Sequence, residues 1–111
     1  MLIKVKVEVA GKFKEYDFNK NQITIGSSSF CDIQVPVAGI SNSHLVVTKI
    51  GPYFYVQDQG SAYGSFILTN KLTPGEKYQF ATYFPVRIAD GISVHLCRSS
   101  LQTSEDKSTA A

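Results

Sequence analysis

Residues 23–47, ITIGSSSFCDIQVPVAGISNSHLVV, carry most of the information about the fold. Two short runs rich in Ile and Val, at 23–25 and 33–35, flank a loop of small residues, and Pro36 ends the second run. A longer apolar run begins at His44, after another polar loop. β-Branched residues bounded by Gly, Pro and Ser are typical of strands. This segment therefore predicts three strands joined by two polar loops.

The rest of the chain continues the β pattern. In residues 2–9, LIKVKVEV, apolar and charged residues alternate, which places every second side chain on the same face of a strand. The chain contains 19 Val and Ile residues together with 6 Tyr and 7 Phe, and these types fit a half-buried pleated sheet. No stretch shows apolar residues at helical spacing with caps around it. The chain is predicted to be all-β.

Short predicted strands are spaced along the chain, with turn signals such as Gly51-Pro52 and Asp90-Gly91 between them. They are residues 2–9, 13–18, 22–25, 32–35, 44–50, 53–57, 66–68, 77–80, 86–88 and 92–97. Such regular spacing is typical of a β-sandwich or barrel. We expect one domain over residues 1–98. Residues 99–111, SSLQTSEDKSTAA, have no periodicity and are predicted to be a flexible linker to a possible further domain.

Composition excludes several classes of protein. A chain of 111 residues has room for one domain, and a net charge of +2 is too small for nucleic acid as a main partner. No apolar run is long enough to cross a membrane, and the charged residues within 2–9 exclude a signal peptide. Cys31 and Cys97 fit a reduced interior as well as a single disulfide, and without a CxxC spacing they do not form a structural zinc site by themselves. We expect no metal, no cofactor and a cytoplasmic location.

The order of the loop motifs resembles that of the forkhead-associated (FHA) domain family. The matching segments are ITIGSSSFCDIQV, GISNSHLVV, VQDQGSAYGSFI and KLTPGEKYQFATYFPVRIADGISVHL. The matching positions are Gly26, Cys31, Asp32, Ile33, Ser41, His44, Asp58, Gly60, Ser61 and Gly64. The resemblance implies an FHA-like β-sandwich of two antiparallel sheets with about ten to eleven short strands. It also places Cys31 at the edge of an inward-facing strand, so we expect Cys31 and Cys97 to be free thiols.

Two departures from the family pattern affect its phosphate site. Ser27 stands where the family has its phosphate-binding Arg, and Tyr63 stands where the family has the Asn of an Asn-Gly pair. A phosphothreonine is recognised mainly by charge-assisted contacts from Arg, and a serine hydroxyl provides no charge. The resemblance therefore implies a degenerate phosphate site. Lys20 or Lys49 compensates only if the fold brings one of them within reach.

The resemblance also implies which loop residues carry the binding site. The predicted partner- or phosphopeptide-binding residues are Ser27, Ser28, Ser41, Asn42, Ala62 and Tyr63, and the predicted supports of the loops are Gly26, His44, Asp58 and Gly64. Ser41 would hydrogen-bond a phosphate, Asn42 the ligand backbone, and the His44 ring would brace the loop.

Each of these residues also has a plainer interpretation. Ser and Asn are common residue types in surface turns, so the alternative for Ser41 and Asn42 is that of ordinary turn residues. The alternative for His44 is a half-buried side chain with satisfied hydrogen bonds and no further role. The loop of Gly26 and its serines is either a backbone anion site or an ordinary connection. Tyr63 is either an exposed interface residue or packed against its own loop. A catalytic Ser–His pair is not expected, because no nucleophile elbow surrounds Ser41 and the side chains of a Ser-x-x-His strand entry need not face each other.

The sequence thus predicts a non-catalytic interaction module of a signalling or scaffolding protein, which binds a protein or peptide through its loops without a strict need for phosphate. The alternative is a phosphothreonine-peptide-binding FHA domain with an altered donor set around Ser41 and Asn42. An enzyme, a nucleic-acid-binding protein and a membrane protein are not expected, and the oligomeric state stays open. Four lysines on the first hairpin are interpreted as a solvated basic face: Lys4, Lys6, Lys12 and Lys14.

Overall fold

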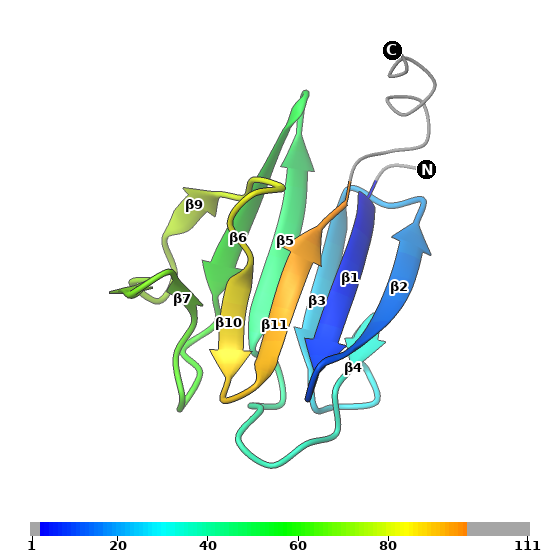
Figure 1. The fold of residues 1–111 in the computed structure, drawn as a ribbon. Helices are drawn as coiled ribbons and strands as arrows, with labels where there is room; N and C mark the ends of the chain where they lie inside the picture. The colour runs from blue at the N-terminus through cyan, green and yellow to red at the C-terminus, as the bar shows by residue number, and fades with distance from the viewer. Residues whose placement is uncertain (1–2, 98–111) are drawn as a thin grey trace.

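The computed structural model describes residues 3–97, which form eleven strands and no helix (Figure 1). The strands are β1 (Ile3–Val9), β2 (Lys12–Phe18), β3 (Gln22–Gly26), β4 (Ile33–Gln34), β5 (Leu45–Ile50), β6 (Tyr53–Asp58), β7 (Phe66–Ile67), β8 (Asn70–Lys71), β9 (Lys77–Gln79), β10 (Val86–Ala89) and β11 (Ile92–Leu96). The described residues accordingly include no helix able to span a membrane. The predicted linker at 99–111 lies outside the described residues.

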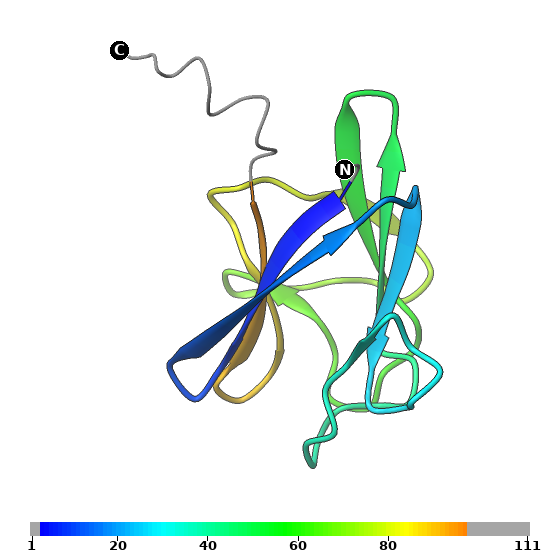
Figure 2. The same ribbon diagram turned by 90° about the vertical axis from the view of Figure 1, so that its right-hand side faces the viewer.

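The strands form two sheets that pack face to face as a sandwich (Figure 2). The six-stranded sheet has the order β2-β1-β11-β10-β7-β8, and the five-stranded sheet has the order β4-β3-β5-β6-β9. Their inward-facing side chains make one continuous apolar core, with fully buried residues such as Ile3, Ile25, Val47, Val56 and Ile88. The predicted all-β sandwich is confirmed.

One strand pair departs from the expected antiparallel arrangement. β4 pairs with β3 in parallel, with Ile33 opposite Ile25. The Asp32 carboxylate explains this, because it accepts the main-chain N–H of Thr24 at 2.9 Å, and the Asp32 N–H donates to Thr24 Oγ1 at 3.1 Å. These bonds return the chain to the middle of β3, so that β4 runs alongside it in the same direction.

The hairpin of β1 and β2 corrects the expected basic face. Val7 is opposite Lys14 and Val9 is opposite Lys12, so these two lysines lie on the core-facing side of β2. Lys4 and Lys6 lie on the other side of the hairpin, because residues of β1 alternate between its faces. The four lysines therefore belong to two surfaces rather than to one.

β8 is the strand that the sequence did not predict. Leu68 adopts a left-handed conformation, with φ of 57°, and the chain then returns so that Asn70 and Lys71 pair with β7. Two polar residues carry no strand signal, so only the pairing itself reveals β8. Both cysteines are free thiols, as predicted, but Cys31 lies half-buried in the loop before β4 rather than on a strand.

Candidate functional site

Three loops meet at one end of the sandwich, opposite the turn between β5 and β6 (Figure 1). Loop 1 (residues 27–32) follows β3, loop 2 (residues 35–44) connects β4 to β5, and loop 3 (residues 59–65) connects β6 to β7. We call these the apical loops. They contain all six residues predicted to bind a partner, and hydrogen bonds connect each loop to the next.

Loop 1 is bonded to loop 2 along its backbone. The Ser27 N–H donates to the Ser41 carbonyl at 2.9 Å, and the Ser28 N–H donates to the Asn42 carbonyl at 3.3 Å. The Ser27 hydroxyl donates to Asn42 Oδ1 at 3.3 Å. The structure thus brings together four of the predicted site residues. Their hydrogen bonds fix the relative position of the two loops.

Gly26 permits this close approach. A Cβ at residue 26 would lie 2.1 Å from the Asn42 carbonyl oxygen and 2.9 Å from that of Ser41, both of them backbone atoms that cannot turn away. Loop 2 therefore passes directly over Gly26, where any other residue would push the two loops apart. Position 26 therefore requires a residue without a side chain, and this is how Gly26 can support the loops.

Loop 2 is bonded to loop 3 through Ser41 and His44. The Ala62 N–H donates to Ser41 Oγ at 3.1 Å, which leaves the Ser41 hydroxyl proton to point elsewhere. The fully buried His44 ring accepts the Ser41 main-chain N–H at Nδ1, 3.2 Å away, and its Nε2 lies 2.9 Å from the Gly64 carbonyl. Since Nδ1 accepts, Nε2 carries the proton and donates. His44 therefore contacts the Ser41 backbone and not its hydroxyl.

Asp58 organises the start of loop 3. Its buried carboxylate accepts the Gly60 and Ser61 N–H groups at 2.9 and 3.1 Å, and the Ser61 and Ser65 hydroxyls at 2.5 and 2.6 Å. Burial by itself raises the pKa of this carboxyl, but the four hydrogen bonds together outweigh it and hold the pKa below its ordinary value. Asp58 is therefore ionised at neutral pH and keeps loop 3 in shape.

The apical loops contain no Lys or Arg, and their outward surface is partly aromatic. Phe30 is 95% exposed, and Tyr63 is 36% exposed. The Tyr63 ring also packs edge-on against Phe66 at 5.7 Å, and the guanidinium of Arg87 lies 4.7 Å from the centre of the Phe66 ring. Tyr63 therefore meets both of its sequence interpretations: it contacts its own loop and still presents a face to solvent.

The two cations considered for compensating the missing Arg are bonded to other groups of the protein. Lys20 Nζ is 2.5 Å from Asp32 Oδ1, and Lys49 Nζ bonds the Gly51 carbonyl in the turn at the opposite end of the sandwich. One cation that was not predicted to lie close to the apical loops is Lys71. Its Cε is 2.8 Å from where a Cβ on Gly64 would stand. No sequence signal identified it, because β8 was not predicted.

Loop 1 does not form a free backbone anion site. The N–H groups of Ser27 and Ser28 bond to loop 2, that of Phe30 bonds to Ser28 Oγ, and that of Cys31 bonds to the Ser28 carbonyl. An anion nest needs successive N–H groups that point to a common empty position.

Among residues 3–97, no cluster of three His, Cys, Asp or Glu side chains is placed to hold a metal ion.

Comparison with known proteins supports the resemblance found in the sequence. The family profile of the FHA domain matches residues 23–89, more than half of the chain. Zeaxanthin epoxidase from Oryza sativa subsp. japonica is 34% identical over 73 residues, which are 61% of this chain but only 11% of that enzyme. The chain thus spans about a tenth of this curated relative.

Solved structures agree on the fold. The Slr1951 protein from Synechocystis sp. superposes with a TM-score of 0.75 at 19% identity, covering 86% of this chain and 97% of that one. An FHA domain studied for phosphothreonine-dependent interactions superposes with a TM-score of 0.72 at 18% identity, again covering 86% and 97% of the two chains. Together with the family profile, which covers loops 1, 2 and 3, these matches lead to one conclusion: the chain belongs to the FHA domain family.

Proposed function

We propose that this domain is a non-catalytic interaction module of a signalling or scaffolding protein, which binds a protein partner through its apical loops without a strict need for phosphate. The proposed contact residues are Ser27, Ser28, Ser41, Asn42, Ala62 and Tyr63. The family supports the general role, since its members include a domain studied for phosphothreonine-dependent interactions. The two free thiols are compatible with a reducing, cytoplasmic compartment.

One observation carries the proposal that phosphate is not strictly required. The residue after Gly26 is a neutral serine, and its hydroxyl is already bonded to Asn42 Oδ1. Loops 1, 2 and 3 contain no Lys or Arg. Recognition of a doubly charged phosphate without a cation loses the charge-assisted hydrogen bonds that make such contacts strong. The exposed aromatic rings of Phe30 and Tyr63 instead suit contacts with a partner's apolar side chains.

The second candidate is phosphothreonine binding with an altered set of donors. Two observations favour it. Because Ser41 Oγ accepts the Ala62 N–H, its own proton can be donated to a ligand. Lys71, beside Gly64, is a cation at the edge of the apical surface. A site of this kind would hold phosphate through a neutral hydroxyl and a lysine, in place of the bidentate fork of an arginine.

Titration of the domain with a phosphothreonine peptide library and its unphosphorylated counterpart, followed by amide NMR, tests the proposal. We expect peptides that bind to perturb the amides of loops 1 and 3 whether or not they are phosphorylated. Tyr63→Ala is the site variant, and Tyr53→Ala is its control, because Tyr53 is an exposed tyrosine at the opposite end of β6. Equal loss of binding in both variants would show that the binding does not depend specifically on the apical loops and would contradict the proposal.

A further inference from the structure

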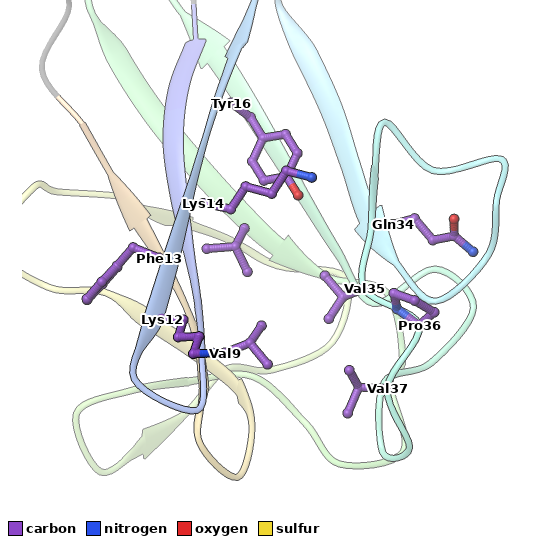
Figure 3. A pocket seen from close by; sticks show the side chains of 10 residues that line it. Val9, Lys12, Phe13, Lys14, Tyr16, Gln34, Val35, Pro36 and Val37 are labelled. Carbon is purple, nitrogen blue, oxygen red and sulfur yellow. The ribbon is translucent and has the colours of Figure 1, made fainter.

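A second, chemically different surface lies at the open side of the sandwich. β2 is the edge strand of one sheet and β4 is the edge strand of the other. Between the β1–β2 hairpin and the segment from Gln34 to Val37 is a groove of about 310 Å³ (Figure 3). Its apolar surface comes from Val7 and Val9 of β1 and from Val35, Pro36 and Val37.

The groove stays open because β2 is polar where the core would need an apolar side chain. Lys12 and Lys14 are opposite Val9 and Val7, and they project from the core-facing side of β2. Each has a charged end that must remain hydrated, so neither fills the space between the sheets. Val9 is only partly buried as a result, and Val37 is 38% exposed. Apolar surface is thus left uncovered beside two cations.

The charge of the groove has one sign. Lys12 and Lys14 are the only charged residues that line it, and its other polar groups are the Gln34 amide and the Tyr16 hydroxyl. The ion pairs found within residues 3–97 use Lys4, Lys20 and His95, so neither groove lysine is neutralised by a carboxylate there. Lys14 Nζ lies 5.5 Å from the centre of the Tyr16 ring, which holds this charge at the rim of the groove.

The outer edge of β2 provides directional contacts as well. β2 pairs with β1 on one side only, so the N–H and C=O groups of its other edge are available among the described residues. An extended peptide can add to such an edge through main-chain hydrogen bonds, while alternate side chains enter a neighbouring groove. Here those side chains would face the valines and Pro36.

From this geometry we propose that the groove between β2 and Gln34–Val37 binds an extended segment of a protein partner, with small aliphatic side chains flanked by Asp and Glu. The aliphatic side chains cover Val9, Pro36 and Val37, and the carboxylates pair with Lys12 and Lys14. A second copy of this chain is the alternative occupant, and the sedimentation experiment below distinguishes it from a partner protein. The groove shares residues 35–37 with the start of loop 2, but it contains none of the six proposed contact residues of the apical site.

A pair of synthetic peptides tests the proposal. Fluorescein-labelled Asp-Glu-Val-Thr-Val-Glu-Asp is the probe, and Lys-Lys-Val-Thr-Val-Lys-Lys is its charge-reversed control, both titrated by fluorescence anisotropy at low salt. We expect the acidic peptide to bind at least about tenfold more tightly than the basic one. Its binding should weaken with added salt. In amide NMR spectra the shifts should fall on β2 and residues 34–37.

Matched double variants locate the site. Lys12→Glu/Lys14→Glu should reduce binding of the acidic peptide at least about tenfold. Lys4→Glu/Lys6→Glu makes the same change of charge on the other face of the hairpin and should leave the affinity nearly unchanged. If the first variant fails to fold, Lys12→Gln/Lys14→Gln takes its place, with a smaller loss expected. Ser41→Ala should have no effect, which separates this groove from the apical site.

Several results would overturn the proposal: no binding of the acidic peptide, equal affinity for the two peptides, equal effects of the two double variants, or shifts confined to residues 27–32, 38–44 and 59–65. Sedimentation of the domain without peptide adds a further check. A dimer that Lys12→Glu/Lys14→Glu dissociates would assign the groove to a second copy of this chain and would also contradict the proposal.

Discussion

The Nε2 atom of His44 lies 2.9 Å from the carbonyl oxygen of Gly64, although twenty positions of sequence separate the two residues. The other ring nitrogen of His44 accepts the Ser41 main-chain N–H at 3.2 Å. One buried ring thus satisfies a donor of loop 2 and an acceptor of loop 3. The position of Tyr63, the residue before Gly64, depends on this bridge.

His44→Ala should therefore destabilise the domain strongly. The substitution leaves the Ser41 N–H and the Gly64 carbonyl without their partner in a buried place, which costs roughly 3 kcal/mol in the free energy of unfolding. His95→Ala is the control, since His95 is partly exposed and pairs with Glu8 at the surface at 3.2 Å. Its loss should be about 1 kcal/mol or less. Urea denaturation of both variants measures the difference, and equal losses would contradict the bridging role.

Gly26→Ala should separate loop 1 from loop 2. The added methyl group would meet the Asn42 carbonyl oxygen at 2.1 Å, so the backbone must move. We expect a loss of about 3 kcal/mol in the free energy of unfolding, typical of overpacking in a tight region. Gly51→Ala is the comparison, because no atom lies within 4 Å of its added methyl group and only its φ of 60° is unfavourable. It should cost about 1 kcal/mol. Thermal or urea unfolding would distinguish the two effects, and a Gly26→Ala domain as stable as the parent would refute the close contact.

The domain should lose stability in acid through Asp58. Its pKa is lowered in the folded protein, because the hydrogen bonds from Ser61, Ser65 and Gly60 outweigh the effect of burial. A carboxyl with a lowered folded-state pKa stabilises the fold fully above its unfolded-state pKa, and this contribution is lost as the pH falls through the folded-state pKa. The free energy of unfolding should thus be steady from pH 7 to 5 and fall below about pH 4.

Asp58→Asn provides the check on that assignment. The amide cannot replace a carboxylate that accepts four hydrogen bonds, so this variant should be less stable at pH 7. Its unfolding free energy should also change less between pH 6 and pH 3 than that of the parent. Asp32 contributes a second acid-sensitive carboxyl. Burial raises its pKa, but bonds from Lys20 and Thr24 prevail and lower it. An unchanged pH dependence in Asp58→Asn would assign the effect to other groups.

Ser27→Arg together with Tyr63→Asn should create phosphothreonine binding. The Arg restores a charge-assisted donor next to Gly26, and the Asn restores the amide that the family has in loop 3. We expect a gain of at least ~1.4 kcal/mol, or a factor of ten, over the parent in isothermal titration with a phosphothreonine peptide. Because the contact is electrostatic and partly exposed, the gain should shrink at high salt. Ser27→Lys with Tyr63→Asn is a useful comparison, as a lysine adds the charge without the bidentate fork.

Much of the fold could be predicted from local patterns in the sequence. The buried positions of the two sheets coincide with these patterns. They include the apolar residues that alternate in β1 and the Ile and Val residues of β3 and β5. β8 and the parallel direction of β4 did not follow, since β8 is defined only by its pairing with β7 and β4 is directed by the bonds between Asp32 and Thr24. The lysines of β2 were placed on the wrong face, because residues 12 and 14 repeat the charge pattern of β1 but lie opposite its valines.

The candidate site, too, could be predicted only in part. The order of motifs located Gly26, Ser41, His44 and Gly64. In the structure, hydrogen bonds join Ser41, His44 and Gly64, and Gly26 leaves room for loop 2 to pass close to it. The surroundings of Tyr63 could not be predicted. Its packing on Phe66 and the position of Lys71 arise from the pairing of β7 with β8 and β10, and neither pairing has a sequence signal of its own.

The ratio of two dissociation constants tests the central claim most directly. One peptide or partner that binds the domain is measured by isothermal titration with its threonine phosphorylated and unphosphorylated. The account predicts a ratio within about threefold, and a loss of about 2 kcal/mol with Tyr63→Ala in either state. Phosphorylated peptide bound at least ten times more tightly, with binding abolished by Ser41→Ala, would contradict the account and establish an altered but functional phosphate site.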